Sequence, residues 1–307
     1  MEHNDLDKKE EDNYLNKFLI KTLNRCIKLI NFLIGKLQFC GAWIILTSNV
    51  LSIGNRNPHI FIVSFPKSGT SWLQMVLYQL TTDGNLDNIT HLMDEIPFLE
   101  VQHDPTNLIP AKFIKTHLPH RFFWMIRKKG KFIYIMRDGL DVAISYYHHY
   151  CNYVNYTDSF DRFYKDYFLN LKAHDGSWFK HVSYWHKEKD NPNVLFIKYE
   201  DMKKDLESVI REIIRFCEFD VKEEDMPRIL ERCGFEYMKQ YEEKIDFAYQ
   251  FNSQLLRQIK EKGNFLRKGK SGYREYYKKR HLIAYQKLFK KYVDGIGLDS
   301  YSKADEI

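Results

Sequence analysis

The chain has 307 residues, of which 44% are apolar and 16% aromatic. This composition can bury a sizeable core and excludes an intrinsically disordered protein. The 47 Lys and Arg against 41 Asp and Glu leave a formal charge of +6. This excess favours an anionic partner without choosing between nucleic acid, a membrane surface and a phosphorylated small molecule. The five cysteines form no CxxC pair, so neither a disulfide framework nor a zinc ribbon is indicated, and a reducing compartment is expected.

The N-terminal part divides into two segments. Residues 1–13 hold six acids and two lysines and are predicted to be a flexible acidic tail. Residues 14–57 are predicted to be an amphipathic helical segment, because basic and apolar residues each recur at near-helical spacing. The basic residues are Lys17, Lys21, Arg25 and Lys28, and the apolar ones are Leu19, Leu23, Ile27, Ile30 and Ile34.

Three roles stay open for this segment: a helix packed on the next domain, a helix lying in a membrane interface, and a membrane span. A span needs about 20 predominantly apolar residues. The run from Leu29 to Leu51 is interrupted by Asn31, Lys36, Gln38 and Asn49. The acidic start argues against a signal peptide. The expected location is the cytoplasm, with contact to a membrane surface through this segment left open.

Residues 58–300 are predicted to form a single α/β domain. His59–Ser64 is typical of a buried parallel strand, Phe65–Gly69 of a loop and Thr70–Thr82 of a helix. Strands alternate with helices along the chain, which predicts a central, mostly parallel sheet flanked by helices. Further strands are expected at Lys112–Thr116, Lys131–Met136 and Asn193–Lys198, and helices at Leu140–Tyr150, Asp158–Leu171, Trp178–Glu188 and Leu206–Cys217.

The loop after the first strand has the residues of a phosphate site. Gly69 lets the backbone approach an anion, the following helix N-terminus presents N–H groups, and Lys67 supplies charge. Ser68, Thr70 and Ser71 add hydroxyl donors. The loop is not a Walker A motif, because its lysine precedes the glycine by two residues. The alternative is an ordinary strand-to-helix turn.

Two other strand ends carry candidate chemistry. Lys115 and His117 lie two residues apart in extended chain, so they point the same way, and His117 can take a proton. The alternative is a surface or structural histidine. Arg137 follows the next strand, with Ser145 about two helical turns on. The alternative there is a salt bridge to Asp138 or Asp141. A cationic, glycine-containing run, Leu266–Gly272, is a candidate anion-binding turn or a solvated loop.

Together these motifs resemble those of the cytosolic-type sulfotransferases. In order they are FPKSGTSW, KTHLP, RDGxDVAxSYYHHY, IKYEDM and RKGxxG, spread between Phe61 and Gly272. The resemblance implies a P-loop-like fold and transfer of a sulfuryl group from 3′-phosphoadenosine 5′-phosphosulfate (PAPS) to a hydroxyl or amine. It implies no metal, and the sequence contains no cluster with metal-ligand spacing.

The resemblance also implies a role for each matching residue. His117 would be the general base, with Lys67 and Lys115 beside the transferring group. Lys67, Ser68, Gly69, Thr70 and Ser71 would hold the 5′-phosphosulfate. Trp72, Tyr199 and Phe235 would contact the adenine. Arg137, Ser145, Arg267, Lys268 and Gly269 would hold the 3′-phosphate.

The chain departs from the family pattern at two places. Cys233 and Gly234 replace the usual Thr-Ser before Phe235, which removes hydroxyl contacts, and Tyr273-Arg274 lie where Asp-Trp is usual. The family's dimer motif is not recognisable, so a homodimer is left open.

The acceptor is expected to be a small molecule. Segments that would line its pocket, Met93–Val101, Tyr146–Tyr156 and the region after Phe235, are rich in aromatic residues, which favours a flat phenol, sterol or other apolar alcohol. The alternative is that these rings belong to the core.

Three rival functions are weighed against the transferase. A catalytically silent nucleotide-binding relative is disfavoured by the intact Lys67, Lys115 and His117. A P-loop kinase or NTPase lacks the Walker lysine position. Nucleic-acid binding is not expected, because no recognition motif accompanies the charge.

Overall fold

The computed structural model describes residues 44–53, 59–128, 130–153, 155–170, 176–246, 266 and 274–294. The chain separates into two compact units, Met1–Ser48 and Asn49–Ile307. Of the first unit only residues 44–48 are described, and they are helical. The acidic tail and most of the amphipathic segment therefore lie outside the described residues, and their roles stay predictions. Among the described helices, none combines the length and the apolar character that crossing a membrane requires.

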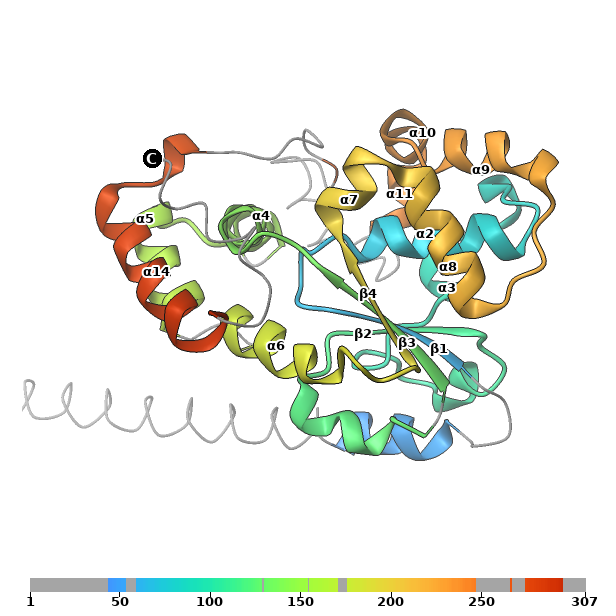
Figure 1. Ribbon diagram of the computed structural model, residues 1–307, viewed down its shortest axis with the longest axis horizontal. Coiled ribbons are helices and arrows are strands. Elements are labelled where there is room, and N and C mark those ends of the chain that lie inside the picture. The colour runs from blue at the N-terminus through green and yellow to red at the C-terminus, as the bar shows by residue number, and fades with distance from the viewer. Residues whose placement is uncertain are drawn as a thin grey trace, which may run out of the picture. The chain divides into compact units, whose positions relative to one another are not determined.

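The centre of the second unit is a sheet of four parallel strands in the order β2-β1-β3-β4 (Figure 1). Every residue of β1 is buried, which agrees with its nearly continuous apolar sequence. Ile62 of β1 lies beside Lys115 of β2 and Ile133 of β3. The strands are β1 (His59–Ser64), β2 (Phe113–Thr116), β3 (Gly130–Met136) and β4 (Val194–Lys198).

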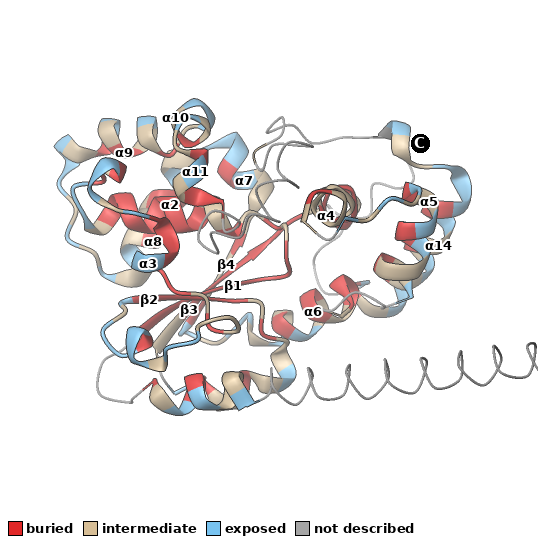
Figure 2. Ribbon diagram, turned by 180° about the vertical axis from the view of Figure 1, so that it is seen from behind, coloured by how far each residue is buried: buried red, intermediate tan, exposed pale blue. Residues whose placement is uncertain are grey.

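Helices lie on both sides of this sheet (Figures 1 and 2). On one side are α2 (Thr70–Thr81), α3 (Leu92–Glu95), α8 (Leu206–Cys217), α9 (Met226–Arg232), α10 (Phe235–Gln240) and α11 (Glu242–Ile245). On the other are α4 (Gly139–Tyr153), α5 (Phe160–Phe163), α6 (Trp178–Trp185) and α14 (Lys279–Tyr292). The short α7 (Tyr199–Lys204) follows β4 directly.

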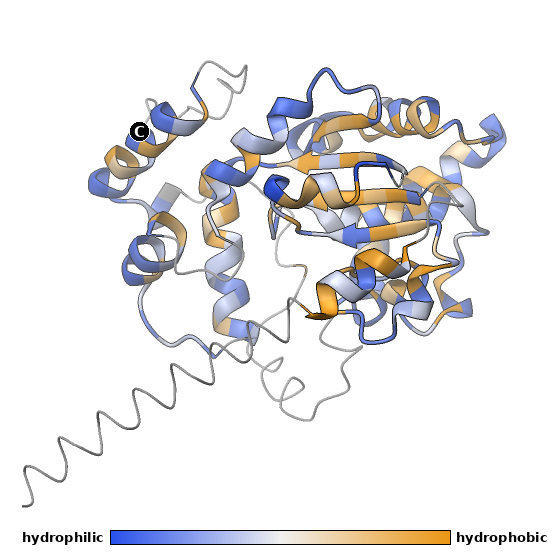
Figure 3. Cartoon of the chain, turned by 90° about the horizontal axis from the view of Figure 1, so that it is seen from below, coloured by the Kyte–Doolittle hydropathy of each residue, from blue (hydrophilic) through white to orange (hydrophobic). Residues whose placement is uncertain are grey.

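The two sheet faces are packed differently. Ile60 and Ile62 of β1 join an aliphatic cluster with α2, α8 and α9. The opposite face is aromatic: Phe61 and Phe132 stack at 4.8 Å, and Phe132 also meets Phe123 at 5.0 Å. Figure 3 shows hydrophobic residues concentrated in the sheet. Both faces are thus covered mainly by apolar and aromatic side chains, and most of the predicted site residues follow the strand ends.

The predicted single α/β domain with a parallel sheet is confirmed, and the four predicted strands are present. The helix predicted over Asp158–Leu171 has a different form: α5 ends at Phe163 and continues as a π-helical turn, Tyr164–Leu169. The helix predicted over Trp178–Glu188 is α6, which ends at Trp185 and continues as a 3₁₀ turn, His186–Glu188. Short 3₁₀ turns that sequence periodicity does not reveal lie at Leu86–Asn88, Pro105–Leu108, His120–Met125, Glu223–Asp225 and Arg274–Tyr276.

Candidate active site

The carboxyl ends of the four strands share one edge of the sheet, and a predicted site residue follows each of them. Because the strands are parallel, the segments that follow β1, β2, β3 and β4 emerge together there. These segments carry Lys67, His117, Arg137 and Tyr199, respectively. Residues from four separate parts of the sequence therefore meet at one edge.

The loop between β1 and α2 exposes main-chain N–H groups at the start of a helix. Lys67 (φ 68°) and Gly69 (φ 106°) are both left-handed, a conformation that is strained for a lysine and is found mostly at functional sites. Gly69 occupies the N-cap position of α2 but forms no side-chain hydrogen bond to the first N–H groups, and the first turn of α2 contains no acid. A helix start without a side-chain cap is suited to binding an anion.

Gly69 is required by packing as well as by conformation. A Cβ atom at this position would lie 2.6 Å from Cδ2 of Tyr199 and 3.1 Å from Cδ1 of Ile135. Tyr199 in turn packs edge-on against Trp72, with ring centroids 5.5 Å apart. The loop, β3 and the start of α7 are therefore in close contact at this residue.

The hydroxyl groups of the loop differ in their surroundings. The Oγ atoms of Ser64 and Thr70 are 2.7 Å apart and hydrogen-bonded. Ser68 is buried, and within the described residues its Oγ has no hydrogen-bond partner. Ser71 is only half-buried. A buried hydroxyl without a partner is costly, so Ser68 fits a site that is completed by a ligand.

Arg137 is a buried cation with few partners. Its Nη1 donates to the carbonyl of Lys67 at 3.3 Å, and its Nη2 lies 3.7 Å from a carboxylate oxygen of Asp141. The guanidinium also covers the Tyr199 ring at 4.4 Å. Among the described residues, Nε has no partner. The salt bridge considered as an alternative is therefore present with Asp141, but it does not involve Nε.

His117 is fixed by its ring and by its main chain. Nδ1 lies 2.9 Å from the carbonyl oxygen of Ser64. A carbonyl only accepts, so Nδ1 carries the proton and Nε2 of the neutral ring has the lone pair. The main-chain N–H of His117 donates to Oε1 of Glu100 at 2.7 Å. The ring also meets Phe98 edge-on, at 5.1 Å.

Lys115 is buried beside the same phenylalanine. Its Nζ lies 4.5 Å from the centroid of the Phe98 ring. Burial lowers the pKa of the Lys115 ammonium to about 8, and the charge of Glu100 acts in the opposite direction. Lys115 and His117 thus share a contact with Phe98, as expected for residues that point the same way along a strand.

Trp72 connects the loop to the turn before α10. Its Nε1 donates to the carbonyl of Cys233 at 2.8 Å. Gly234 follows, and a Cβ there would lie 2.9 Å from the carbonyl oxygen of Glu231. Phe235 begins α10 with 39% of its surface exposed. The unusual Cys-Gly pair thus supports this contact through the main chain.

The remaining 3′-phosphate candidates are only partly described. Ser145 is half-buried on α4. Arg267, Lys268 and Gly269 lie outside the described residues. Leu266, just before them, is held at both main-chain groups: its N–H donates to Glu242, and its carbonyl accepts from Lys239. In the part of the chain that the structure describes, no group of His, Cys, Asp and Glu could hold a metal ion.

Residues of α6 that were not predicted from the sequence support the site. His181 contacts the main-chain carbonyl of His117 through Nε2 at 3.2 Å, and its Nδ1 contacts the buried hydroxyl of Tyr134 at 2.9 Å. Trp185 donates to the carbonyl of Leu118 at 3.0 Å. The signal in the sequence is a polar, hydrogen-bonding residue on the apolar face of a predicted helix.

The aromatic residues of α4 divide between core and site. Tyr146 is buried and packs edge-on against Phe65 and Phe163, so the core interpretation holds for it. Tyr153 is half-buried and donates to Asp246 at 2.8 Å. The other aromatic residues of the predicted acceptor-lining segment Tyr146–Tyr156 are half-buried: Tyr147, His148, His149, Tyr150 and Tyr156.

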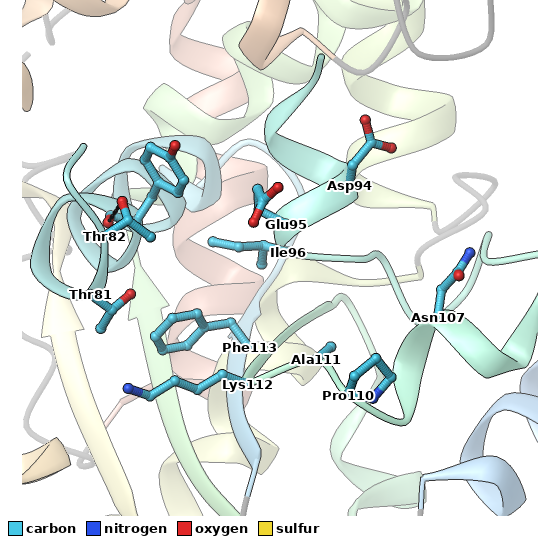
Figure 4. A pocket seen from close by; sticks show the side chains of 11 residues that line it. Thr81, Thr82, Asp94, Glu95, Ile96, Asn107, Pro110, Ala111, Lys112 and Phe113 are labelled. Atoms are coloured by element: carbon cyan, nitrogen blue, oxygen red, sulfur yellow. Dashed lines mark hydrogen bonds between the residues drawn. The ribbon is translucent and has the colours of Figure 1, made fainter. Parts of the chain in front are cut away.

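A pocket of about 350 Å³ lies at the other end of the sheet (Figure 4). Its lining includes Thr82 near the end of α2 and Phe113 at the start of β2, together with Glu95 and Lys112. Three of its lining residues, Asp94, Glu95 and Ile96, belong to the segment Met93–Val101 that was predicted to line the acceptor pocket, but none is a predicted catalytic or nucleotide-binding residue. The pocket is therefore not the candidate active site.

The comparisons with known proteins identify the family. A model described as the sulfotransferase domain matches residues 57–297. The chain belongs to the sulfotransferase family. Amine sulfotransferase from Oryctolagus cuniculus is 33% identical over 226 residues, covering 71% of this chain and 74% of that relative. Sulfotransferase 1E1 from Homo sapiens is 32% identical over 209 residues, covering 62% of this chain and 69% of that relative. The predicted cytosolic-type sulfotransferase family and the predicted enzyme class are confirmed.

Solved structures agree with this assignment. A mouse sulfotransferase, SULT7A1, crystallised with PAP (adenosine 3′,5′-bisphosphate), has a TM-score of 0.64 and 28% identity; the match covers 82% of this chain and 88% of that protein. Retinol dehydratase in complex with androsterone and inactive cofactor PAP has a TM-score of 0.66 at 23% identity, covering 82% and 86%. The similarity to retinol dehydratase supports the fold of this sulfotransferase. The similarity to SULT7A1 supports both the fold and a nucleotide site.

Proposed function

We propose that the domain of residues 58–300 transfers the sulfuryl group of PAPS to a hydroxyl or amine of a small aromatic or apolar acceptor. The observation that carries the proposal is a pair of buried donors, Ser68 Oγ and Arg137 Nε, without partners among the described residues. They lie at the uncapped start of α2 and at the end of β3, where the chain supplies no acid of its own to the helix start. The mouse relative bound to PAP supports the same ligand class.

The loop between β1 and α2 would hold the 5′-phosphosulfate. Main-chain N–H groups of the first turn of α2 and the Ser68 hydroxyl would meet its oxygens, with Thr70 and Ser71 completing the set. Lys67 would neutralise the charge that grows on the leaving phosphate oxygen. Donors fixed in advance cost no reorganisation during transfer, which is why such an arrangement accelerates an in-line displacement.

The rest of the nucleotide would extend from the loop. Arg137 would bind the 3′-phosphate, and this explains why its guanidinium is buried with so few partners. Ser145, Arg267, Lys268 and Gly269 are proposed to share that role. Trp72, Tyr199 and Phe235 would bind the adenine. The hydrogen bond from Trp72 to the carbonyl of Cys233 holds the Trp72 ring near the turn that precedes Phe235.

His117 would act as the base. With Nδ1 donating to the carbonyl of Ser64, the lone pair of Nε2 can accept the acceptor's proton. The acceptor oxygen or nitrogen forms a bond to sulfur, the bond from sulfur to the phosphate oxygen breaks, and PAP leaves. Lys115 would stabilise the negative charge on the sulfuryl group.

Binding distinguishes this proposal from a P-loop kinase. Calorimetry with adenosine 3′,5′-bisphosphate and with ATP should show tight binding of the former and weak binding of the latter. Preference for ATP would contradict the nucleotide assignment. Transfer of labelled sulfate from PAPS to a panel of phenols, apolar alcohols and amines then tests catalysis. Tight PAP binding with complete inertness across the panel would favour the catalytically silent relative.

A further inference from the structure

A short segment after α3 is joined to the strand that carries Lys115. The main chain of Lys115 forms two hydrogen bonds with this segment. The N–H of Lys115 donates to the carbonyl of Pro97 at 2.9 Å, and the carbonyl of Lys115 accepts from the N–H of Leu99 at 2.8 Å. Phe98, between them, forms a parallel bridge with Lys115. The segment therefore extends the sheet beyond β2 by a single residue, directly beside the proposed catalytic pair.

Glu100 ends this segment and holds the turn that follows β2. Its Oε1 accepts from the hydroxyl of Thr116 at 2.6 Å and from the main-chain N–H of His117 at 2.7 Å. The Thr116 hydroxyl oxygen then accepts from the N–H of Leu118 at 3.0 Å. One carboxylate oxygen thus fixes the backbone on which the imidazole is mounted, through short bonds at a half-buried position.

We propose that Glu100 is a positioning residue for sulfuryl transfer, which orients His117 through its main chain and balances the buried charge of Lys115. The proposal rests on the proposed function of His117 and Lys115. Glu100 needs no contact with either substrate in this role, because it acts through the turn and through its charge.

The charge balance follows from the surroundings of Lys115. Among the described residues, the negative charge of Glu100 favours the ammonium of Lys115. His91 at the start of α3 also interacts with Lys115: burial lowers the pKa of His91, and the charge of Lys115 lowers it further. His117 shares the Phe98 ring with it. Burial disfavours the ammonium, so Glu100 supplies the opposing electrostatic contribution.

Two substitutions separate the two parts of the role. In Glu100→Gln the amide oxygen can still accept from Thr116 and His117, but the charge is gone. In Glu100→Ala both are lost. We expect Glu100→Ala to lower kcat on the order of 10²-fold, the loss typical of a small misplacement, with PAP affinity unchanged. We expect Glu100→Gln to keep most of kcat at pH 6.5 and to lose it at a lower pH than the wild type as pH rises.

The matched control is Glu212→Gln. Glu212 is an exposed acid on α8, outside the segments predicted to line the acceptor pocket and without a proposed role in the site. Its neutralisation changes the net charge by the same amount and should leave both kcat and the pH profile unchanged. Thermal unfolding of all three variants shows whether any loss of rate merely reports a smaller folded fraction.

A readout that does not require catalysis distinguishes failure of the Glu100 proposal from failure of the proposed function. Titration of the Lys115 side-chain nitrogen by NMR in lysine-labelled protein, assigned with Lys115→Arg, should move to lower pH in Glu100→Gln and stay in place in Glu212→Gln. An unmoved Lys115 titration together with an unchanged kcat in Glu100→Ala overturns the proposal. A shifted titration in a protein that transfers no sulfate overturns the proposed function and leaves the charge balance intact.

Discussion

Nδ1 of His117 lies 2.9 Å from the main-chain carbonyl of Ser64, so the end of β1 fixes the tautomer of a ring mounted at the end of β2. Both strands are buried along their whole length, and their register is set by parallel pairing. The position of Nε2, the nitrogen proposed to act as the base, is thus determined by the two strand ends.

Replacing His117 should remove turnover and spare nucleotide binding. In His117→Ala the base is lost, and the rate should fall by about 10²–10⁴-fold, the usual contribution of general base catalysis. No nucleotide contact is proposed for this ring, so the calorimetric affinity for PAP should stay within about twofold of the wild type. Turnover near the wild-type rate with the preferred acceptor would refute the assignment of the base.

Activity should decline on the alkaline side because Lys115 loses its proton. Burial lowers its pKa to about 8, so the ammonium is present below that pH and is lost as pH rises through it. The plot of kcat/KM against pH should fall in this region. In Lys115→Arg the charge persists at any accessible pH, so whatever activity remains should no longer decline there. An identical alkaline decline in Lys115→Arg would assign it to another group.

A methyl group at Gly69 should impair the loop more than the same change at Gly176. Both glycines have positive φ, 106° and 78°, but a Cβ at Gly69 meets Tyr199 at 2.6 Å, whereas a Cβ at Gly176 meets nothing within 4 Å. Gly176→Ala should therefore report only the backbone cost, about 1–3 kcal/mol. Gly69→Ala should add loss of PAP affinity, at least about tenfold, because the loop must shift. Equal effects on PAP affinity would show that the contact with Tyr199 is unimportant.

Asp138 should make stability fall as pH rises. Burial, and next the charge of Asp141, raise its pKa from 3.8 to about 7, so the folded state binds a proton that the unfolded state has lost between these values. This contribution to stability is present below pH 4 and lost as pH rises through about 7. Asp138→Asn keeps an oxygen that can accept from the N–H groups of Leu140 and Asp141. As pH rises from 5 to 8, the free energy of unfolding of Asp138→Asn should increase relative to that of the wild type by on the order of 1 kcal/mol, measured by denaturant unfolding. A difference independent of pH would contradict the raised pKa.

The strand, loop and helix around Lys67 were predictable because their signals are local. A buried apolar run, a glycine and a helical repeat lie within 25 residues, and β1, the loop and α2 follow them closely. The gathering of Lys67, His117 and Arg137 was also predictable, because parallel strands end at one edge.

Glu100 and His181 were beyond sequence reasoning for a physical reason. Glu100 contacts His117 across 17 residues and His181 contacts it across 64, and neither contact leaves a periodicity in the sequence. The π-helical turn after α5 was also not predicted, because helical spacing of apolar residues does not distinguish it from an α-helix.

The hydrogen bond from Trp72 to Cys233 reaches a carbonyl oxygen, an atom that every amino acid possesses. Substitutions at position 233 can therefore accumulate during evolution without loss of this contact, provided that they fit the aliphatic cluster in which the side chain is buried. A search pattern that demands Thr-Ser before Phe235 would reject this chain although its turn is intact. Patterns for such enzymes should weight the residues that act through side chains, and leave the positions that act through the main chain free to vary.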